Sequence, residues 1–81
     1  MTVATRLHFT DGNTRAIFTV DLVQDLLGDW VLTQAWDGIE GRSAVRRVVV
    51  AGHEEGLRML QKIARHKERL GFRPVHLYHV G

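Results

Sequence analysis

The sequence of 81 residues has no cysteine, one proline and one serine, Ser43. Without cysteine the chain has no disulfide bridges, thiolate zinc sites or thiol nucleophiles, which suits a reducing compartment such as the cytoplasm. The single serine, with no nucleophile–base pair and no phosphate-binding loop, gives no support for catalysis. We therefore expect a cytoplasmic protein that is not an enzyme and has no catalytic residues.

Long apolar runs and metal-ligand spacings are lacking too. No apolar run approaches the ~20 residues of a membrane span, and the first residues do not form a signal peptide, so we expect no membrane partner. His76 and His79 are three residues apart and would point to opposite faces of a strand. The other histidines, His8, His53 and His66, share no ligand spacing. We expect neither a metal site nor another cofactor.

Charge is present but unevenly distributed. The net charge of +2 conceals two Lys/Arg against six Asp/Glu in residues 1–40, and nine against three in residues 41–81. A basic half can face nucleic acid or an acidic protein, or it can be a solvated surface with ion pairs between the halves. The hydrophobic content of 44% is ordinary for a globular protein, and this length makes one domain, which we place at 1–81.

Alternation of apolar and polar residues predicts four strands. The predicted strands are Val3–Thr10, Arg15–Val23, Trp30–Trp36 and Ser43–Val50. Asp11-Gly12-Asn13 favours a tight turn, so the first two strands should pair antiparallel. We expect residues 37–41 to form a loop. The apolar run at 48–50 predicts that the end of its strand is covered on both faces.

A helical period then replaces the alternation. Apolar residues fall on one arc from about His53 to Leu70, and Gly71 follows as the expected C-cap. Val75–Val80 is predicted to be a last short strand. Together these elements predict an α+β fold, a small antiparallel β-sheet of four to five strands with one helix packed across it.

The segment Asp25–Trp36 combines a turn with a strand that has a tryptophan at each end. Leu26 and Leu27 are expected to anchor the turn as buried apolar side chains. Trp30 and Trp36 share one face of the strand, since side chains alternate between faces. We expect Trp30 to lie in the core, and Trp36, beside the next turn, to be partly exposed.

Arginines gather after Trp36, at Arg42, Arg46 and Arg47. An aromatic ring can stack on a base or sugar of a nucleic acid while a neighbouring guanidinium binds phosphate. The alternative is that Trp36 is a core residue. We predict that these four residues contribute to nucleic-acid binding.

The predicted helix has a basic stripe opposite its apolar arc, formed by Arg58, Lys62, Arg65 and Arg69. Four like charges on one face favour a nearby anion such as a phosphate backbone, whereas the alternative is an ordinary polar helix face. Lys67 lies within the apolar arc. We expect it to extend along the core or to pair with a buried carboxylate, for which Asp25 is a candidate.

Several residues between about Ile17 and Phe72 match the pattern of a known domain family. It comprises the turn residues Asp25, Leu26 and Gly28, the tryptophans Trp30 and Trp36, and Lys67 followed by Gly71-Phe72. In these positions the sequence resembles the WGR domain, in which a DLFGxW turn leads to a strand that ends in Trp-Gly-Arg. Here the signature reads Trp36-Asp37-Gly38, so both the glycine and the arginine are replaced.

The resemblance implies a fold and a partner. WGR domains are small antiparallel sheets crossed by one helix. They occur in poly(ADP-ribose) polymerases, where they help to bind DNA breaks, and as stand-alone or fused bacterial modules. In the polymerases the motif tryptophan lies against the terminal nucleotide, a role that would pass to Trp36, and the motif arginine links to neighbouring domains. The resemblance thus implies a stand-alone, bacterial-type DNA-binding module.

Two hypotheses of function follow from the residues and the resemblance. The first is a small non-enzymatic module that binds nucleic acid, with DNA as the expected form, through its basic C-terminal half and Trp36. The alternative is a protein–protein interaction module that docks an acidic partner or associates with itself. The sequence specifies no oligomeric state.

Overall fold

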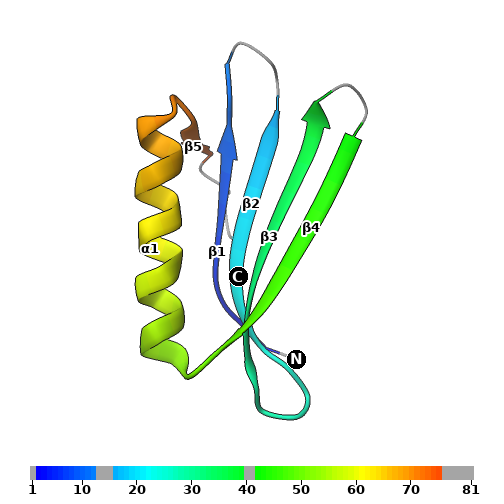
Figure 1. Cartoon of the computed structure of the whole chain (residues 1–81), viewed down its shortest axis with the longest axis vertical. Helices are drawn as coiled ribbons and strands as arrows, with labels where there is room; N and C mark the ends of the chain where they lie inside the picture. Colours follow the sequence, from blue (N-terminus) through cyan, green and yellow to red (C-terminus); the bar gives the residue numbers. More distant parts are fainter. Residues whose placement is uncertain (1, 13–15, 40–41, 76–81) are drawn as a thin grey trace, which may run out of the picture.

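Figure 1 shows the computed structural model of the chain, which describes residues 2–12, 16–39 and 42–75. Within these residues the elements are β1 (Thr2–Thr10), β2 (Ile17–Gln24), β3 (Trp30–Ile39), β4 (Arg42–Val50), α1 (His53–Arg69) and β5 (Arg73–Val75). The strands form one sheet in the order β4-β3-β2-β1-β5, and all neighbours are antiparallel. The predicted α+β fold, with one helix packed across a small antiparallel sheet, is confirmed.

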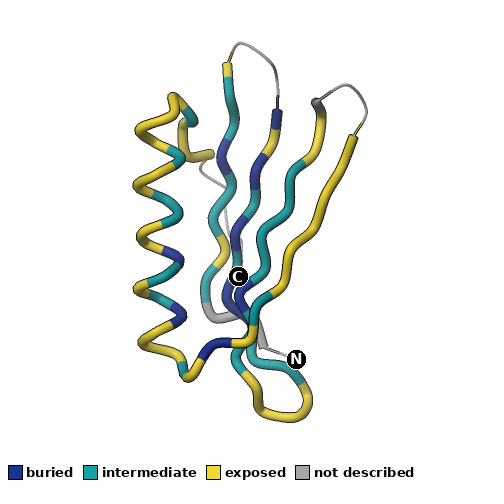
Figure 2. Tube along the Cα trace, in the orientation of Figure 1, coloured by how far each residue is buried: buried dark blue, intermediate teal, exposed yellow. Residues whose placement is uncertain are grey.

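The hydrophobic core lies between α1 and the middle of the sheet. Alternation along β2 directs Phe18, Val20 and Leu22 toward α1, and these side chains have no measurable exposure. The rest of the buried cluster comes from neighbouring elements: Phe9, Leu32, Val50 and Leu60. Each such side chain contributes about 1.5–3 kcal/mol by leaving water. Figure 2 shows this buried strip in dark blue along the central strands and the facing side of α1.

A glycine allows α1 to lie close to β2. Gly56 is buried in the second turn of the helix. A Cβ atom at this position would collide with the side chain of Leu22 and would lie 3.2 Å from that of Val50. Glycine inside a helix normally costs about 1 kcal/mol relative to alanine. Here it permits the close approach that buries Leu22.

The C-terminus of α1 has a Schellman motif. Gly71 adopts the left-handed conformation, with φ of 96°. Its N–H donates to the carbonyl of Glu68 at 3.1 Å, and the N–H of Phe72 donates to the carbonyl of Lys67 at 3.0 Å. This arrangement turns the chain back so that Phe72 meets Lys67. The C-cap predicted at Gly71 is therefore present.

No described helix or second sheet covers the other face of the sheet, which we call the open face, although Val23 on it is only 8% exposed. Val45 and Val49 of β4 are 61% and 67% exposed there, whereas Val50 is buried beneath α1. The prediction that residues 48–50 are covered on both faces is therefore wrong at Val49. The reason is that α1 covers only one side of the sheet, and no second layer exists among the described residues.

The turn between β2 and β3 is held by a carboxylate and not by leucines. Leu26 and Leu27 are 88% and 87% exposed, so the prediction that they anchor the turn is wrong. Asp25 Oδ1 instead accepts hydrogen bonds from the N–H groups of Leu27 and Asp29 at 3.0 and 2.8 Å. Gly28 provides the positive φ, 87°, that the turn requires.

Two boundaries and one side chain also differ from expectation. The loop predicted at 37–41 is shorter, because β3 continues to Ile39 through an irregularity at Gly38, whose φ is 97°. The strand predicted at Val75–Val80 begins earlier, at Arg73, and its residues 76–80 lie outside the described part. Trp30, expected in the core, packs at its edge, with its ring centroid 4.9 Å from that of His53.

Candidate nucleic-acid interface

Trp36 lies on the helix side of β3, half-buried at the edge of the core. Its strand partners are Phe18 on β2 and Ala44 on β4. The rings of Trp36 and Phe18 are 5.3 Å apart between centroids and tilted by 54°. Ala44 is exposed and small, so one flank of the indole has little cover from β4. Trp36 thus contacts the core and also keeps part of its surface in solvent.

Two of the predicted arginines flank this tryptophan. Arg42 and Arg46 lie two residues to either side of Ala44, so alternation along β4 places them on the same face as Trp36. Diagonal neighbours of this kind on paired strands are about 7–8 Å apart, within reach of a long side chain. Both arginines are exposed. Trp36, Arg42 and Arg46 therefore form one cluster, which we call the tryptophan cluster.

Arg47 does not belong to this cluster. It pairs with Thr33 in the register of β3 and β4, and both residues face the open side of the sheet. Adjacency in sequence had grouped Arg46 with Arg47, but adjacent residues of a strand point to opposite faces. Trp36 and Arg47 are thus separated by the thickness of the sheet.

The basic stripe of α1 points away from the sheet. Its four members are all exposed: Arg58, Lys62, Arg65 and Arg69. At 100° per residue they lie opposite Leu60, which is buried against the strands. None of the four forms an ion pair with any residue in the described ranges. The stripe therefore presents exposed positive charge along the outer surface of the helix, with Glu54, Glu55 and Glu68 as the nearby acids of the same helix.

Lys67 connects the helix to the aromatic side chains. Its Nζ lies 4.4 Å from the ring centroid of Phe18, 5.3 Å from that of Phe72 and 5.6 Å from that of Trp36. These are cation–π distances, and they hold the C-terminal turn of α1 beside Trp36. Burial lowers the pKa of Lys67 below its usual value of 10.5. Lys67 thus extends along the core, one of the two predicted arrangements.

The candidate pairing of Lys67 with Asp25 is wrong. Asp25 is engaged in the turn before β3, and Lys67 faces three rings instead. No direct signal in the sequence pointed to Phe18 and Phe72, since an aromatic residue in a strand or after a helix is usual in any core. Only the sheet register and the Schellman motif bring these two rings to the same amine.

An ion pair on the open face was also not predicted. Arg6 of β1 and Asp21 of β2 are partners in the hairpin register, and Arg6 Nη2 lies 3.2 Å from Asp21 Oδ2. The other carboxylate oxygen, Asp21 Oδ1, is buried and accepts no hydrogen bond from the part of the chain that the structure describes. This ion pair could have been predicted from the sequence. A hairpin that turns at Asp11-Gly12 places Arg6 opposite Asp21, and both residues lie on the polar side of their strands.

Comparisons with protein-family models, curated proteins and solved structures found no match to this chain. Within the described ranges, no three His, Asp or Glu side chains gather in a way that could hold a metal ion. The same residues include no helix with the length and apolarity needed to cross a membrane.

Proposed function

We propose that the protein is a non-enzymatic, cytoplasmic module that binds nucleic acid, with DNA as the expected form. The bound strand would lie on the helix side, where the basic stripe contacts phosphates and the tryptophan cluster contacts a strand end. The observation that carries the proposal is the stripe itself, because Arg58, Lys62, Arg65 and Arg69 point outward without ion pairs among the described residues.

Physical chemistry supports a polyanion as the partner of this surface. Like charges spaced one turn apart on a helix repel one another, so their arrangement on one face favours a ligand with regularly spaced negative charges. A nucleic-acid backbone provides such charges and gains entropy when bound cations are released. The WGR resemblance, at Trp36 and in the turn that begins at Asp25, supports the same interpretation.

A salt titration of a short duplex tests the stripe. Neutralising its four cations to glutamine should weaken binding and reduce the log–log salt slope by about 0.9 for each DNA phosphate that the variant no longer binds. Arg47→Gln provides the matched control, because it removes one cation from the opposite face and should leave the slope unchanged. An unchanged slope in the quadruple variant would remove the stripe from the proposal.

A second titration tests Trp36 at DNA ends. Base–aromatic stacking contributes about 1–3 kcal/mol, so Trp36→Ala should weaken binding to a blunt duplex by roughly 5- to 150-fold. Binding to a duplex closed at both ends by hairpin loops should change little. Since Trp36 also packs on Phe18, unfolding curves must first show that the variant is folded at the assay temperature. Equal losses on both duplexes would exclude end stacking.

A specific observation favours a second candidate function, a module that docks an acidic protein. β4 is the edge strand of the sheet on one side, and residues 42–47 within it are all exposed. Edge strands offer unpaired backbone groups for another strand, and the three arginines of β4 would favour an acidic one. No binding to short DNA at about 150 mM salt, weaker than the non-specific range of ~10⁻⁴–10⁻⁶ M, would favour this candidate.

A further inference from the structure

The open face of the sheet combines charge with apolar surface in an ordered way. Its side chains form rows across β2, β3 and β4, since paired residues lie side by side. One row is apolar, Val23–Val31–Val49. The next is charged at both ends, Asp21–Thr33–Arg47. The third is Thr19–Ala35–Val45. A shallow hollow of about 400 Å³ lies over the charged row and part of the apolar row, with Arg6 and Asp25 also in its lining.

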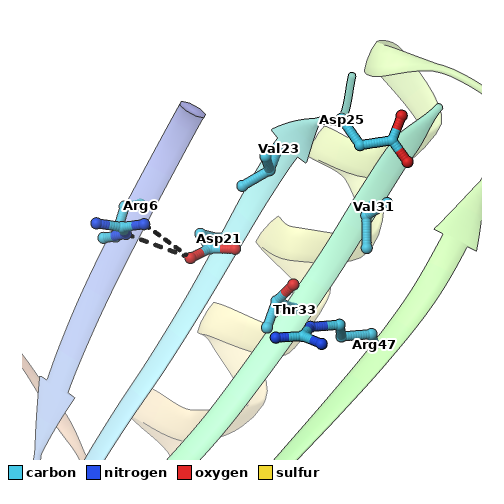
Figure 3. Close-up of a pocket in the computed structure, with 7 residues that line it drawn as sticks. All are labelled: Arg6, Asp21, Val23, Asp25, Val31, Thr33 and Arg47. Atoms are coloured by element: carbon cyan, nitrogen blue, oxygen red, sulfur yellow. Dashed lines mark hydrogen bonds and ion pairs between the residues drawn. The ribbon is translucent and has the colours of Figure 1, made fainter. Parts of the chain in front are cut away.

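The charged row has a buried acceptor at one end and an exposed cation at the other. Asp21 Oδ1 is buried and has no hydrogen-bond partner among the described residues, because Arg6 binds only the other carboxylate oxygen. A buried acceptor without a donor costs roughly 1–3 kcal/mol, more for a charged group. Figure 3 shows the Arg47 guanidinium extending from β4 to the side of Thr33, and within the described residues it forms no ion pair. The row therefore presents a carboxylate at one end and an exposed guanidinium at the other.

We propose that a second copy of this chain covers the open face, related by a two-fold axis that runs along β3 between the two sheets. Rotation about such an axis places β4 of one copy over β2 of the other and keeps the rows in register. Each Arg47 then lies over Asp21 of the other copy, so opposite charges face each other across the contact. Face-to-face sheets pack about 10 Å apart, a gap that an arginine and an aspartate together can span.

The same operation matches the apolar residues. Val49 of each copy lies over Val23 of the other, and Val31 meets its own counterpart on the axis. Val45, which is 61% exposed in one copy, lies over Thr19. Like charges do not face each other in any of the three rows. This self-complementarity favours a second copy over a different protein whose surface is only acidic or only basic. Isologous contact is the usual form of a homodimer.

The size of the face predicts a weak dimer. Three strands about 4.8 Å apart, each contributing about six residues at a rise of about 3.4 Å, give a contact of roughly 300 Å² in projection for each copy. Stable interfaces usually bury about 800 Å² per partner, so we expect dissociation in the micromolar range or weaker. The helix and its basic stripe lie on the far side of each sheet, so this proposal does not depend on nucleic-acid binding.

Sedimentation of the full chain from about 10 µM to about 1 mM tests the proposal, since mass action favours dimer at high concentration. The weight-average mass should rise toward twice the monomer mass of 9.2 kDa. Arg47→Glu should raise the dissociation constant roughly 100-fold or more, because it removes both symmetric ion pairs and places like charges together. Arg46→Glu, on the covered face, should leave it unchanged.

Cross-linking locates the contact independently, since the chain has no native cysteine. Thr33→Cys lies on the axis and should give covalent dimers with a short bis-maleimide, whereas Ala44→Cys, exposed on the helix side, should not. A wild-type protein that stays monomeric at about 1 mM overturns the proposal. Equal weakening of the dimer by Arg47→Glu and Arg46→Glu also overturns it, as does cross-linking through Ala44→Cys. Either result would place the contact elsewhere.

Discussion

The two faces of the sheet are made from alternate residues of the same strands, yet they differ in almost every property. Phe18 is fully buried beneath α1, and its neighbour Ile17, on the open face, is 48% exposed. The middle of the covered face is apolar, with Lys67 beside it and the arginines of the tryptophan cluster along β4. The open face carries Arg6, Asp21 and Arg47 among valines. Alternation thus decides which residues share a face, and the single helix decides which face becomes the core.

The largest effect should come from removing a ring of the covered face. Phe18→Ala should lower the free energy of unfolding by about 3–5 kcal/mol, because it leaves a cavity between Phe9, Trp36 and Lys67. Ile17→Ala, one residue earlier on the open face, should cost less than about 1 kcal/mol. Urea unfolding of the two variants measures the contrast. Similar losses would show that the open face is also covered in the isolated chain.

The close approach of α1 to the sheet should reverse the usual effect of replacing glycine. Gly→Ala at an unstrained site normally stabilises by about 0.4–1 kcal/mol. Gly56→Ala should instead destabilise by about 1–3 kcal/mol, because the added methyl group meets Leu22 and Val50.

Gly52→Ser is the control for Gly56→Ala, because Gly52 is the N-cap of α1, where serine is at least as favourable as glycine. Nothing lies within 4 Å of an added Cβ at Gly52, and its φ of −176° is open to any residue. Thermal unfolding should therefore show a lower midpoint for Gly56→Ala alone. A stabilised Gly56→Ala protein would mean that α1 lies farther from β2 than the packing here requires.

The turn before β3 should depend on its aspartate more than on its leucines. Asp25→Ala removes the acceptor of two backbone N–H groups and should cost about 0.5–2 kcal/mol, as the loss of a helix cap does. The double change Leu26→Ser with Leu27→Ser should stay within about 0.5 kcal/mol of wild type, because both side chains are exposed. Chemical unfolding of both proteins checks this order, and a larger loss from the leucine pair would contradict it.

The smallest effect concerns the pH dependence given by Lys67. Burial lowers the pKa of Lys67 in the folded chain below its usual 10.5, so between the two values the unfolded chain binds more protons than the folded one. The free energy of unfolding should therefore rise as pH increases through this window, and the cost of burying the charge is fully present below it.

The difference in unfolding free energy between wild type and Lys67→Met isolates this contribution, because the other groups titrate alike in both proteins. That difference should move in favour of wild type as the pH rises from about 8 toward 10.5. Lys62→Met, an exposed member of the basic stripe, should show no such change. A flat difference for Lys67→Met would indicate that the three rings offset the effect of burial.

Most of the fold could be predicted from the sequence because strand and helix periods are local. Apolar residues occur at every second position at Phe18, Val20 and Leu22, which predicts a strand. Gly71 follows a clear helical arc, which predicts the end of the helix. Neither prediction needs knowledge of the rest of the chain. Exposure of Leu26, Leu27 and Val49 could not be predicted in this way. It depends on whether a second layer covers the open face, and no local period contains that information.

The candidate site shows the same division. Trp36, Arg42 and Arg46 do share one face, as their grouping in sequence suggested, and the basic stripe is exposed as the helical period indicated. Arg47 could have been separated from Arg46 by applying alternation to β4. The three rings around Lys67 could not be foreseen, because they come from β2, from β3 and from Phe72 in the turn after α1, which only the tertiary structure brings together.

The position of β1 has a consequence for synthesis on the ribosome. This first strand lies between β2, which follows it directly, and β5, which pairs with residues 8–10 through residues 73–75. Chains emerge from the N-terminus at roughly 5–20 residues per second, so that edge of β1 stays unpaired until the helix and β5 have been translated. During those seconds the unpaired edge of β1 is open to a strand from a neighbouring chain, and β5 closes it only at the end of translation.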